Sequence, residues 1–242
     1  MTDRSLDDSR ITESGTHHRP KKFAVVFDMD GVILDTETIV LKCWKDIAQK
    51  YHIAGIEAAC RASLGLTAAA TIQTFKRIYG EDFPYEPYKA EVRELFFGKY
   101  YGKHLPLKQG AKEILQHLKE KNIPVALASS TREAVVRREL EDAGVLQYFD
   151  KVICGDMVQH SKPHPEIFLT ACRELGVSPR ETYAVEDSFN GILSAHAGGL
   201  KAVMVPDQIQ PDEEIRALTV KICRSLSEAE EFLLGGDRKV SF

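Results

Sequence analysis

The sequence lacks a long hydrophobic run. None of its apolar stretches approaches the roughly 20 residues that a membrane-spanning helix needs, and residues 1–20 are polar, without the apolar segment of a signal peptide. We therefore expect no membrane association and predict that residues 1–20 are a disordered tail. Runs of lysine or arginine are lacking too, and the formal net charge is −4. Nucleic acid is accordingly not an expected partner.

Paired cysteines are also lacking. The five cysteines are odd in number, scattered along the chain and never spaced C-x-x-C. Such cysteines are typical of reduced, mostly buried thiols in a cytosolic protein, so we predict a cytoplasmic location. For the oligomeric state, we expect a monomer or a weak dimer.

The sequence does contain five short apolar runs with helical patterns between them. The runs do not alternate apolar and polar residues, which is typical of strands covered on both faces. Alternation of such strands with helices predicts an α/β fold with a doubly wound parallel sheet. The predicted strands are residues 23–27, 124–128, 152–154, 182–185 and 202–205.

An insertion separates the first two predicted strands. Roughly ninety residues lie between them, far more than one crossover connection needs. Helical patterns cover residues 36–51, 68–79 and 87–100 of this stretch. We therefore predict a helical cap at residues 37–101, inserted into a catalytic core made of residues 21–36 and 102–242.

Two later helices have recognisable start signals. Pro165 is predicted at the first turn of one helix, where its missing N–H costs nothing. Residues 227–230, Ser-Glu-Ala-Glu, resemble a capping box that would open the last helix.

Polar side chains stand where the predicted strands end, and one lysine follows the third strand. Because the carboxyl ends of parallel strands meet at one edge of a sheet, these side chains are expected to converge where ligands bind. For each acidic pair alone, a helix N-cap or a solvated loop is the simpler explanation. The residues are Asp28, Asp30, Ser129, Ser130, Thr131, Lys162, Glu186, Asp187 and Ser188.

The expected cluster carries too much negative charge to stand alone. Two carboxylates about 4 Å apart repel by about 4 kcal/mol at an effective dielectric constant of about 20. Lys162 supplies one positive charge and Mg²⁺ would supply two. Mg²⁺ prefers a few carboxylates, water and phosphate oxygens, whereas no histidine or cysteine near these residues in sequence favours zinc. The cluster therefore predicts a Mg²⁺ site that accepts a phosphoryl group.

Four motifs built on these residues resemble those of the haloacid dehalogenase superfamily. Residues 28–32, "DMDGV", resemble its nucleophile loop, and Ser129 in "VALASS" fits the second motif. Lys162 in "SKPHPEIF" and the Glu-Asp pair of "VEDSFNG" fit the third and fourth. The resemblance covers residues 21–234, and the helical insertion is similar to the cap of the β-phosphoglucomutase-like branch. It implies a core of this family's fold and a hydrolase acting on a small phosphorylated metabolite.

The resemblance also implies roles for single residues. Asp28 would attack phosphorus and become an aspartyl-phosphate. Asp30 would act as general acid and base. Ser129 would donate a hydrogen bond to a phosphoryl oxygen, and Lys162 would neutralise the phosphate and the aspartyl charge.

Further roles concern the metal and the substrate. The Mg²⁺ ligands would be the carboxylates of Asp28 and Asp187 and the backbone carbonyl of Asp30. Glu186 would lie behind these ligands or hold a metal-bound water. The predicted substrate contacts are Thr36, Glu37 and Ser130. Glu37 could accept hydrogen bonds from sugar hydroxyls, or it could simply be a first-turn residue favoured by the helix dipole.

The scaffold permits several reactions. True dehalogenases resemble this family but lack the second aspartate, so Asp30 argues against dehalogenation. Phosphonate hydrolysis would use a cap lysine, for which Lys42 and Lys45 are candidates, although a solvated helix face explains both better. A non-catalytic binding protein could also use the same scaffold.

The main rival to a phosphatase is a sugar-phosphate mutase. β-Phosphoglucomutases carry a cap histidine where we align Val40, and a cap arginine in a stretch that here reads "GLTAA", residues 65–69. A mutase needs a cap cation to hold the distal phosphate. The lack of both residues favours a phosphatase for sugar phosphates or nucleoside monophosphates. In either case the cap is predicted to close over the substrate, with hinges at residues 34–36 and 102–107.

Overall fold

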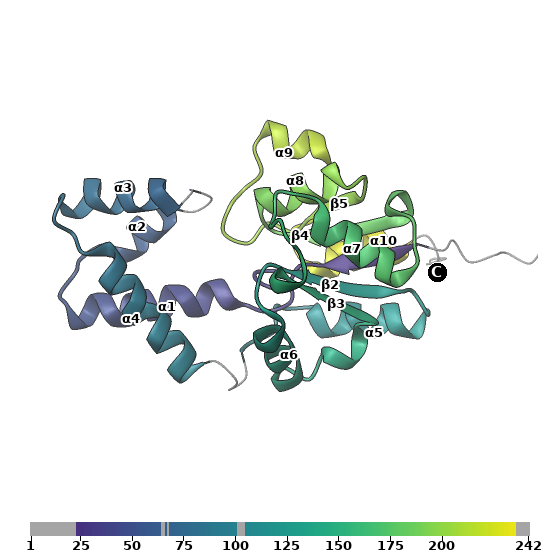
Figure 1. The fold of residues 1–242 in the computed structure, drawn as a ribbon, viewed down its shortest axis with the longest axis horizontal. Coiled ribbons are helices and arrows are strands. Elements are labelled where there is room, and N and C mark those ends of the chain that lie inside the picture. The colour runs from purple at the N-terminus through teal and green to yellow at the C-terminus, as the bar shows by residue number, and fades with distance from the viewer. Residues whose placement is uncertain (1–22, 64–65, 67, 101–104, 236–242) are drawn as a thin grey trace, which may run out of the picture.

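The computed structural model describes residues 23–63, 66, 68–100 and 105–235, and its central element is a parallel sheet (Figure 1). Every pair of neighbouring strands is parallel, and their order is β3-β2-β1-β4-β5-β6. This confirms the predicted doubly wound α/β fold. The strands are β1 (Ala24–Phe27), β2 (Val125–Ser129), β3 (Lys151–Cys154), β4 (Thr182–Glu186), β5 (Lys201–Met204) and β6 (Thr219–Ile222).

Strand β6 was not predicted. This strand lies at the edge of the sheet, beside β5, and none of its residues is fully buried. An edge strand of this kind needs no continuous apolar run, so its sequence, Thr-Val-Lys-Ile, carries no signal of the type that marks β1 to β5.

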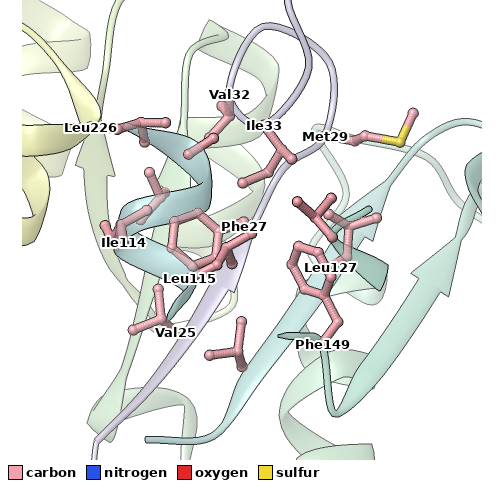
Figure 2. Packing of buried hydrophobic residues seen from close by; sticks show 14 of the residues in the cluster. Val25, Phe27, Met29, Val32, Ile33, Ile114, Leu115, Leu127, Phe149 and Leu226 are labelled. Atoms are coloured by element: carbon pink, nitrogen blue, oxygen red, sulfur yellow. The ribbon is translucent and has the colours of Figure 1, made fainter. Parts of the chain in front are cut away.

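Helices cover both faces of the sheet because the residues of β1 alternate in direction. Val25 and Phe27 pack into one apolar cluster together with α5 and α10 (Figure 2). Val26 points to the other face, where α7, α8 and α9 contribute to a second cluster. The core helices are α5 (Ala111–Glu120), α6 (Glu133–Asp142), α7 (Glu166–Leu175), α8 (Phe189–Ala197), α9 (Glu213–Leu218) and α10 (Leu226–Leu234).

The inserted helices form a separate unit beside the sheet (Figure 1). Trp44 is its centre, with ring centroids 5.3 Å from Phe75 and 5.9 Å from Tyr85. The short helix α2 was not predicted. The predicted tail at residues 1–20 and the hinge residues 102–104 lie outside the described part of the chain. The helices of this unit that the structure describes are α1 (Thr36–Lys50), α2 (Ile56–Ala62), α3 (Ala68–Tyr79) and α4 (Tyr85–Lys99).

Two helix starts differ from their predicted positions. Pro165 is the N-cap of α7 and not its first helical residue. The last helix is capped by Ser225, whose Oγ accepts a hydrogen bond from Glu228 N at 3.2 Å, and not by Ser227. The physical reason is burial: starting α10 at Leu226 places that residue and Ala229 in the apolar cluster beneath the sheet.

The apolar helices and the cysteines are the remaining features of this fold. Within the described ranges, no helix combines the length and the apolar character that crossing a bilayer requires. All five cysteines are unpaired, four of them buried and Cys60 partly exposed.

Candidate active site

The register of the sheet brings the acidic strand ends together. Phe27 of β1 lies opposite Val185 of β4, so Asp28 and Glu186 leave neighbouring strands at the same level. Asp28 N donates to the carbonyl of Val185 at 3.0 Å, which extends the pairing by one residue. The two carboxylates therefore begin from fixed backbone positions on one edge of the sheet.

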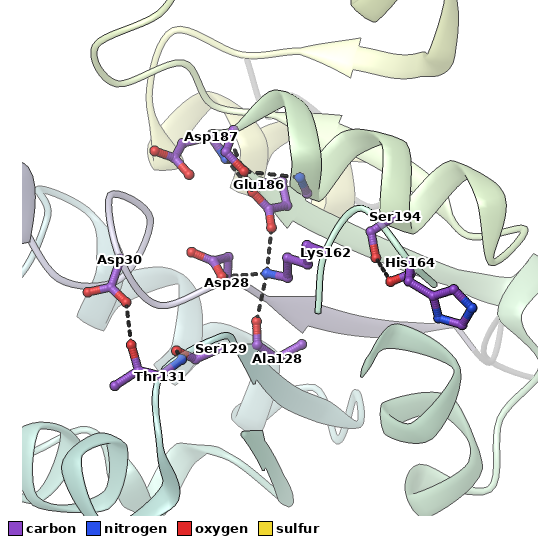
Figure 3. A network of polar contacts seen from close by, with 12 residues as sticks. Asp28, Asp30, Ala128, Ser129, Thr131, Lys162, His164, Glu186, Asp187 and Ser194 are labelled. Carbon is purple, nitrogen blue, oxygen red and sulfur yellow. Dashed lines mark hydrogen bonds and ion pairs between the residues drawn. The ribbon is translucent and has the colours of Figure 1, made fainter. Parts of the chain in front are cut away.

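Lys162 connects three of the strand ends (Figure 3). Its Nζ lies 2.5 Å from Asp28 Oδ1 and 2.6 Å from Glu186 Oε1, and it donates to the carbonyl of Ala128 at 2.9 Å. An ammonium group has three donors, so this geometry occupies all of them. Burial by itself would lower the pKa of Lys162, but the adjacent Asp28 and Glu186 carboxylates outweigh it and raise that pKa. The lysine is a fixed positive charge at this edge.

The second oxygen of Glu186 is held by the loop that follows β4. It accepts hydrogen bonds from Asp187 N at 3.1 Å, Ser188 N at 3.2 Å and Ser188 Oγ at 3.0 Å. Ser188 also caps α8, because its Oγ accepts from Gly191 N at 3.0 Å. A Cβ on Gly191 would overlap the Glu186 carboxylate. Only glycine therefore lets α8 begin so close to this carboxylate.

The carboxylate of Asp187 lies close to that of Asp28 and to Gly31 in the loop of the first motif. Ligand oxygens of Asp28, Glu186 and Asp187 all lie within 4.8 Å of one another. Gly31 allows this approach: its φ is +81°, and a Cβ there would overlap Asp187 Oδ2. The glycine after Asp30 thus serves both the turn of the chain and the close approach of Asp187.

The charges of this cluster are poorly balanced by the protein alone. Burial, only partly opposed by Lys162, raises the pKa of Asp28 to about 7. Burial and the nearby Glu186 and Asp28 raise the pKa of Asp187 to about 9. A divalent cation would reverse this by favouring the ionised carboxylates. Since both oxygens of Glu186 already have partners, Asp28 and Asp187 are the side chains best placed to hold such a cation.

Asp30 lies to one side of this cluster, among hydroxyl groups. Thr131 Oγ1 donates to Asp30 Oδ2 at 3.3 Å. Burial raises the pKa of Asp30, while the nearby hydroxyl groups of Thr36 and Thr131 act in the opposite direction. Of these two, only Thr131 makes a hydrogen bond, because Thr36 Oγ1 is buried without a hydrogen-bond partner in the structure. Ser129 is fully buried, and its Oγ accepts from Thr131 N at 3.1 Å. That contact leaves the Ser129 hydroxyl proton available for another acceptor.

Glu37 stands where the active-site edge meets the cap. It lines a cavity of about 210 Å³ together with Asp187 and Gln208. It also lines a cavity of about 140 Å³ whose walls are mostly cap residues, among them Trp44 and Phe75. Burial and the nearby Asp207 raise the pKa of Glu37. The two cavities share Glu37 and Gln208, so they adjoin between the carboxylates and the cap.

The structure brings some of the predicted site residues together and leaves others apart. Asp28, Lys162, Glu186 and Asp187 form one cluster, and Asp30 with buried Thr36 lies beside it. Ser130 is exposed, and its contact with substrate stays a prediction. The catalytic roles given to the other residues stay predictions as well.

Sequence reasoning gave no individual role to several supporting groups, although Thr131 and Ser188 were among the polar residues expected at the strand ends. Thr131 and Ser188 hold the carboxylates of Asp30 and Glu186. Ser188 had a usable signal, since serine after a strand and before a helix is a preferred N-cap. The carbonyl of Ala128 had none, because every residue offers one and only the fold selects which carbonyl meets Lys162.

The motifs of this site are shared with a known family. A family model described as haloacid dehalogenase-like hydrolase matches residues 25–205, which is more than half of the chain. The chain belongs to the haloacid dehalogenase-like hydrolase family. The match begins in β1 and ends just after β5, so it includes all four motifs.

Relatives within this family carry two kinds of name. A phosphorylated carbohydrates phosphatase of Thermotoga maritima is 30% identical over 180 residues, which cover 74% of this chain and 83% of the relative. A beta-phosphoglucomutase of Bacillus subtilis is 32% identical over 192 residues, covering 75% and 82%. The solved structure of a family hydrolase from Deinococcus radiodurans, with bound phosphate and sodium, has a TM-score of 0.76 at 22% identity. It covers 89% of this chain and 96% of its own, and this likeness shows the fold alone.

Proposed function

We propose that this protein is a Mg²⁺-dependent phosphatase that hydrolyses a small phosphorylated metabolite, a sugar phosphate or a nucleoside monophosphate. The observation that carries the proposal is the contact of Lys162 with Asp28 at 2.5 Å, with Asp187 and Asp30 beside it. A carboxylate nucleophile, a fixed cation and a second carboxyl group are the parts that phosphoryl transfer to and from an aspartate requires.

In the first half of the reaction, Asp28 Oδ attacks phosphorus and the bond from phosphorus to the ester oxygen breaks. Lys162 holds the Asp28 carboxylate in position and offsets the charge of the phosphoryl oxygens. The hydroxyl of Ser129 donates to one of those oxygens. Asp30 protonates the departing alkoxide, and its raised pKa favours the protonated form that this step needs.

In the second half, water attacks the aspartyl-phosphate. Asp30, now ionised, accepts a proton from that water, and phosphate leaves while Asp28 is regenerated as a carboxylate. The hydrogen bond from Thr131 keeps the Asp30 carboxylate oriented during both transfers.

The metal in this proposal is Mg²⁺, held by the side chains of Asp28 and Asp187 and the backbone carbonyl of Asp30. The oxygen-only donor set and the crowded carboxylates fit this hard cation. When bound, it would offset the carboxylate charge and polarise the phosphoryl oxygens. Glu186 would act indirectly, by fixing Lys162 with one oxygen and the loop of Asp187 with the other.

The residues around Glu37, where the leaving group of the substrate would lie, favour a phosphatase over a mutase. Lys108 pairs with both Asp207, at 2.8 Å, and Asp35, at 3.7 Å. Burial and the carboxylates of Asp207 and Asp35 raise the pKa of Glu37 and Lys108 lowers it, so three carboxylates in this group face one ammonium group. A second phosphate would be repelled there, whereas sugar hydroxyls could donate to Glu37. Val40 lines the cap cavity, where the mutase alignment expects a histidine. Among the proposed substrate contacts, Glu37 has the strongest support, followed by Thr36 and Ser130.

A sugar-phosphate mutase stays the second candidate because of two observations. One relative is named a beta-phosphoglucomutase, and Arg61 lines the cap cavity and could meet a distal phosphate. Against this, Arg61 is paired with Glu57 on the same helix. Conversion of β-glucose 1-phosphate to the 6-phosphate faster than its hydrolysis would favour the mutase.

Phosphonate hydrolysis has less support, because both candidate lysines, Lys42 and Lys45, already interact with other side chains of the cap. Lys45 pairs with Glu57 at 2.6 Å, and Lys42 lies over the ring of Tyr100.

The proposed location and assembly of the protein follow from its composition. The five unpaired thiols support our proposal of a reducing, cytoplasmic location. We retain a monomer or weak dimer as the proposed state.

The proposal is tested by incubating the protein with a panel of sugar phosphates and nucleoside monophosphates, with Mg²⁺ or with EDTA. We expect Mg²⁺-dependent release of phosphate from at least one compound, and a loss of at least about a thousandfold in kcat for Asp28→Asn. A folded, Mg²⁺-loaded protein that releases no phosphate from any compound would reject it. So would an Asp28→Asn variant with substantial activity.

A further inference from the structure

The turn that carries Lys162 has an outer face that takes no part in the proposed chemistry. His164 N donates to the carbonyl of Ser161 at 3.0 Å, which closes a four-residue turn with Lys162 inside it. Ser194, fully buried on α8, donates to the carbonyl of His164 at 2.7 Å and anchors the turn. Lys162 points to the carboxylates, while the imidazole of His164 points away from them (Figure 3).

Two imidazoles and one carboxylate meet on this outer face. The rings of His160 and His164 are 4.5 Å apart between centroids and inclined by 36°. His160 Nδ1 lies 2.9 Å from Glu166 Oε2, and His164 Nδ1 lies 3.9 Å from the same oxygen. Potential ligand atoms of the three residues all lie within 4.8 Å of one another.

The side chain of Glu166 is held in place by backbone donors. Its two oxygens accept hydrogen bonds from Gln159 N at 2.9 Å and His160 N at 3.0 Å. A carboxylate oriented by backbone donors is the arrangement that supports metal ligands in proteins.

The nitrogen lone pairs are also arranged suitably. His164 Nδ1 accepts from Glu166 N at 3.3 Å, so its lone pair is already turned toward the Glu166 side. His160 Nδ1 shares a proton with Glu166 Oε2 at 2.9 Å. A bound cation would take the place of the proton on His160 Nδ1, with the neutral imidazole then carrying its proton on Nε2. It would also replace the contacts between His164 Nδ1 and Glu166.

We propose that His160, His164 and Glu166 form a second metal site, for Zn²⁺, on the outer face of the turn that holds Lys162. Two imidazoles and one carboxylate are a donor set that zinc uses, with water in the remaining position. Ligand distances of about 2.0–2.2 Å require atoms somewhat over 3 Å apart. The two contacts with Glu166 Oε2, 2.9 Å and 3.9 Å, lie on either side of that value, so the side chains would have to rotate to close the site. The site is separate from the oxygen-only cluster of Asp28 and Asp187, which suits Mg²⁺.

A brace within the loop is the simpler interpretation of the same residues. The hydrogen bonds to Glu166 from residues 159 and 160 could by themselves stabilise the chain before α7. That interpretation gives His164 only the hydrogen bond that its Nδ1 accepts from Glu166 N, whereas the metal site requires both imidazoles as ligands. The two interpretations therefore differ in what His164→Ala does to zinc affinity.

The test is Zn²⁺ binding to the full chain, measured by competition with a chromogenic chelator in excess Mg²⁺, which occupies the carboxylate cluster. Co²⁺ absorption in the visible range reports imidazole ligation independently. We expect Zn²⁺ affinity to fall at least about tenfold in His164→Ala, in His160→Ala and in Glu166→Gln, since even residues behind a metal's ligands contribute tenfold to a hundredfold.

Matched controls separate this site from other histidines. His117 pairs with Glu230 at 2.7 Å, and in the described part of the chain this pair belongs to no three-ligand group. His117→Ala should keep the wild-type affinity, and so should a His17→Ala/His18→Ala variant, which removes two adjacent histidines near the N-terminus. Unchanged zinc affinity in a His160→Ala/His164→Ala double variant would overturn the proposal. Loss of the tight zinc only in the His17→Ala/His18→Ala variant would overturn it as well.

Discussion

The active-site edge of the core and the cap are held together by different forces. At the edge, Lys162 binds two carboxylates and a carbonyl that come from β1, β2 and β4. In the cap, Trp44 packs on Phe75 and Tyr85, and ion pairs such as that of Lys45 are largely exposed. Directed polar contacts fix atoms at the edge, whereas apolar packing in the cap fixes only volumes. The positions of the groups proposed to carry out the chemistry are therefore fixed more closely than the positions of the cap residues that would select the substrate.

The largest effect is expected at Lys162. In Lys162→Met the buried Asp28 and Glu186 carboxylates lose their counter-charge, which should cost about 3–5 kcal/mol of stability and nearly all activity. The loss of stability is measured as the free energy of unfolding in urea at pH 8 with EDTA. The loss of activity is measured as phosphate release.

The control for this variant is an exposed ion pair. Lys119 Nζ lies 3.4 Å from Asp150 Oδ1, with about half of the lysine side chain exposed. Lys119→Met should change little, because such pairs are screened by water. Equal losses in the two variants would contradict the account of the active-site edge.

A smaller effect is expected from a single methyl group at Gly191. In Gly191→Ala the new Cβ would overlap the Glu186 carboxylate and displace both it and Lys162. We expect kcat to fall by about a hundredfold, since misplacement by about 1 Å can cost this much. Steady-state kinetics with a proposed substrate measures it.

Gly98 on α4 of the cap is the matched position. Nothing lies within 4 Å of a Cβ placed there. Gly98→Ala should keep kcat and gain stability of about 0.5–1 kcal/mol, because alanine restricts the unfolded chain. A loss of activity at Gly98 equal to that at Gly191 would remove the distinction between the two regions.

The charge of the edge also predicts a pH dependence. The pKa values of Asp28 and Asp187 are raised from 3.8 to about 7 and about 9. Between about pH 4 and pH 9 the folded protein then binds more protons than the unfolded chain, so its stability without metal falls as pH rises.

Mg²⁺ should counteract this loss, since it favours the ionised carboxylates. At a hundredfold excess over its Kd it adds about 2.7 kcal/mol, which corresponds to roughly 5 °C or more in Tm. Thermal unfolding with Mg²⁺ or EDTA at pH 5 and pH 8.5 measures this, and the increase should be larger at pH 8.5. An increase that is equal at both values would contradict the charge assignment.

The smallest effect is expected in the cap. Trp44→Phe keeps an aromatic ring in the cluster but changes the wall of the cavity next to Glu37. We expect KM to change by less than about tenfold, differently for different substrates, with kcat nearly constant. If kcat fell to the same extent for every substrate, the cap would take part in the chemistry itself.

The same contrast explains what the sequence could predict. Strand ends and their acidic residues were readable because β1, β2 and β4 are mostly buried and apolar, and polar residues stand at or directly after their ends. Thr131 and the carbonyl of Ala128 were not readable, since their importance depends on which distant groups the sheet brings beside them. Helix α2 and strand β6 are short and partly exposed, so they left no periodic pattern.

The most direct test is to look for the phosphoryl group on Asp28 itself. The protein is mixed with Mg²⁺ and a substrate found in the panel, quenched in acid during turnover, digested and analysed by mass spectrometry. The account predicts one additional PO₃ unit on the peptide that contains Asp28, and none in Asp28→Asn. Turnover with the phosphoryl group on another residue, or with Asp28→Asn as active as the wild type, would contradict it.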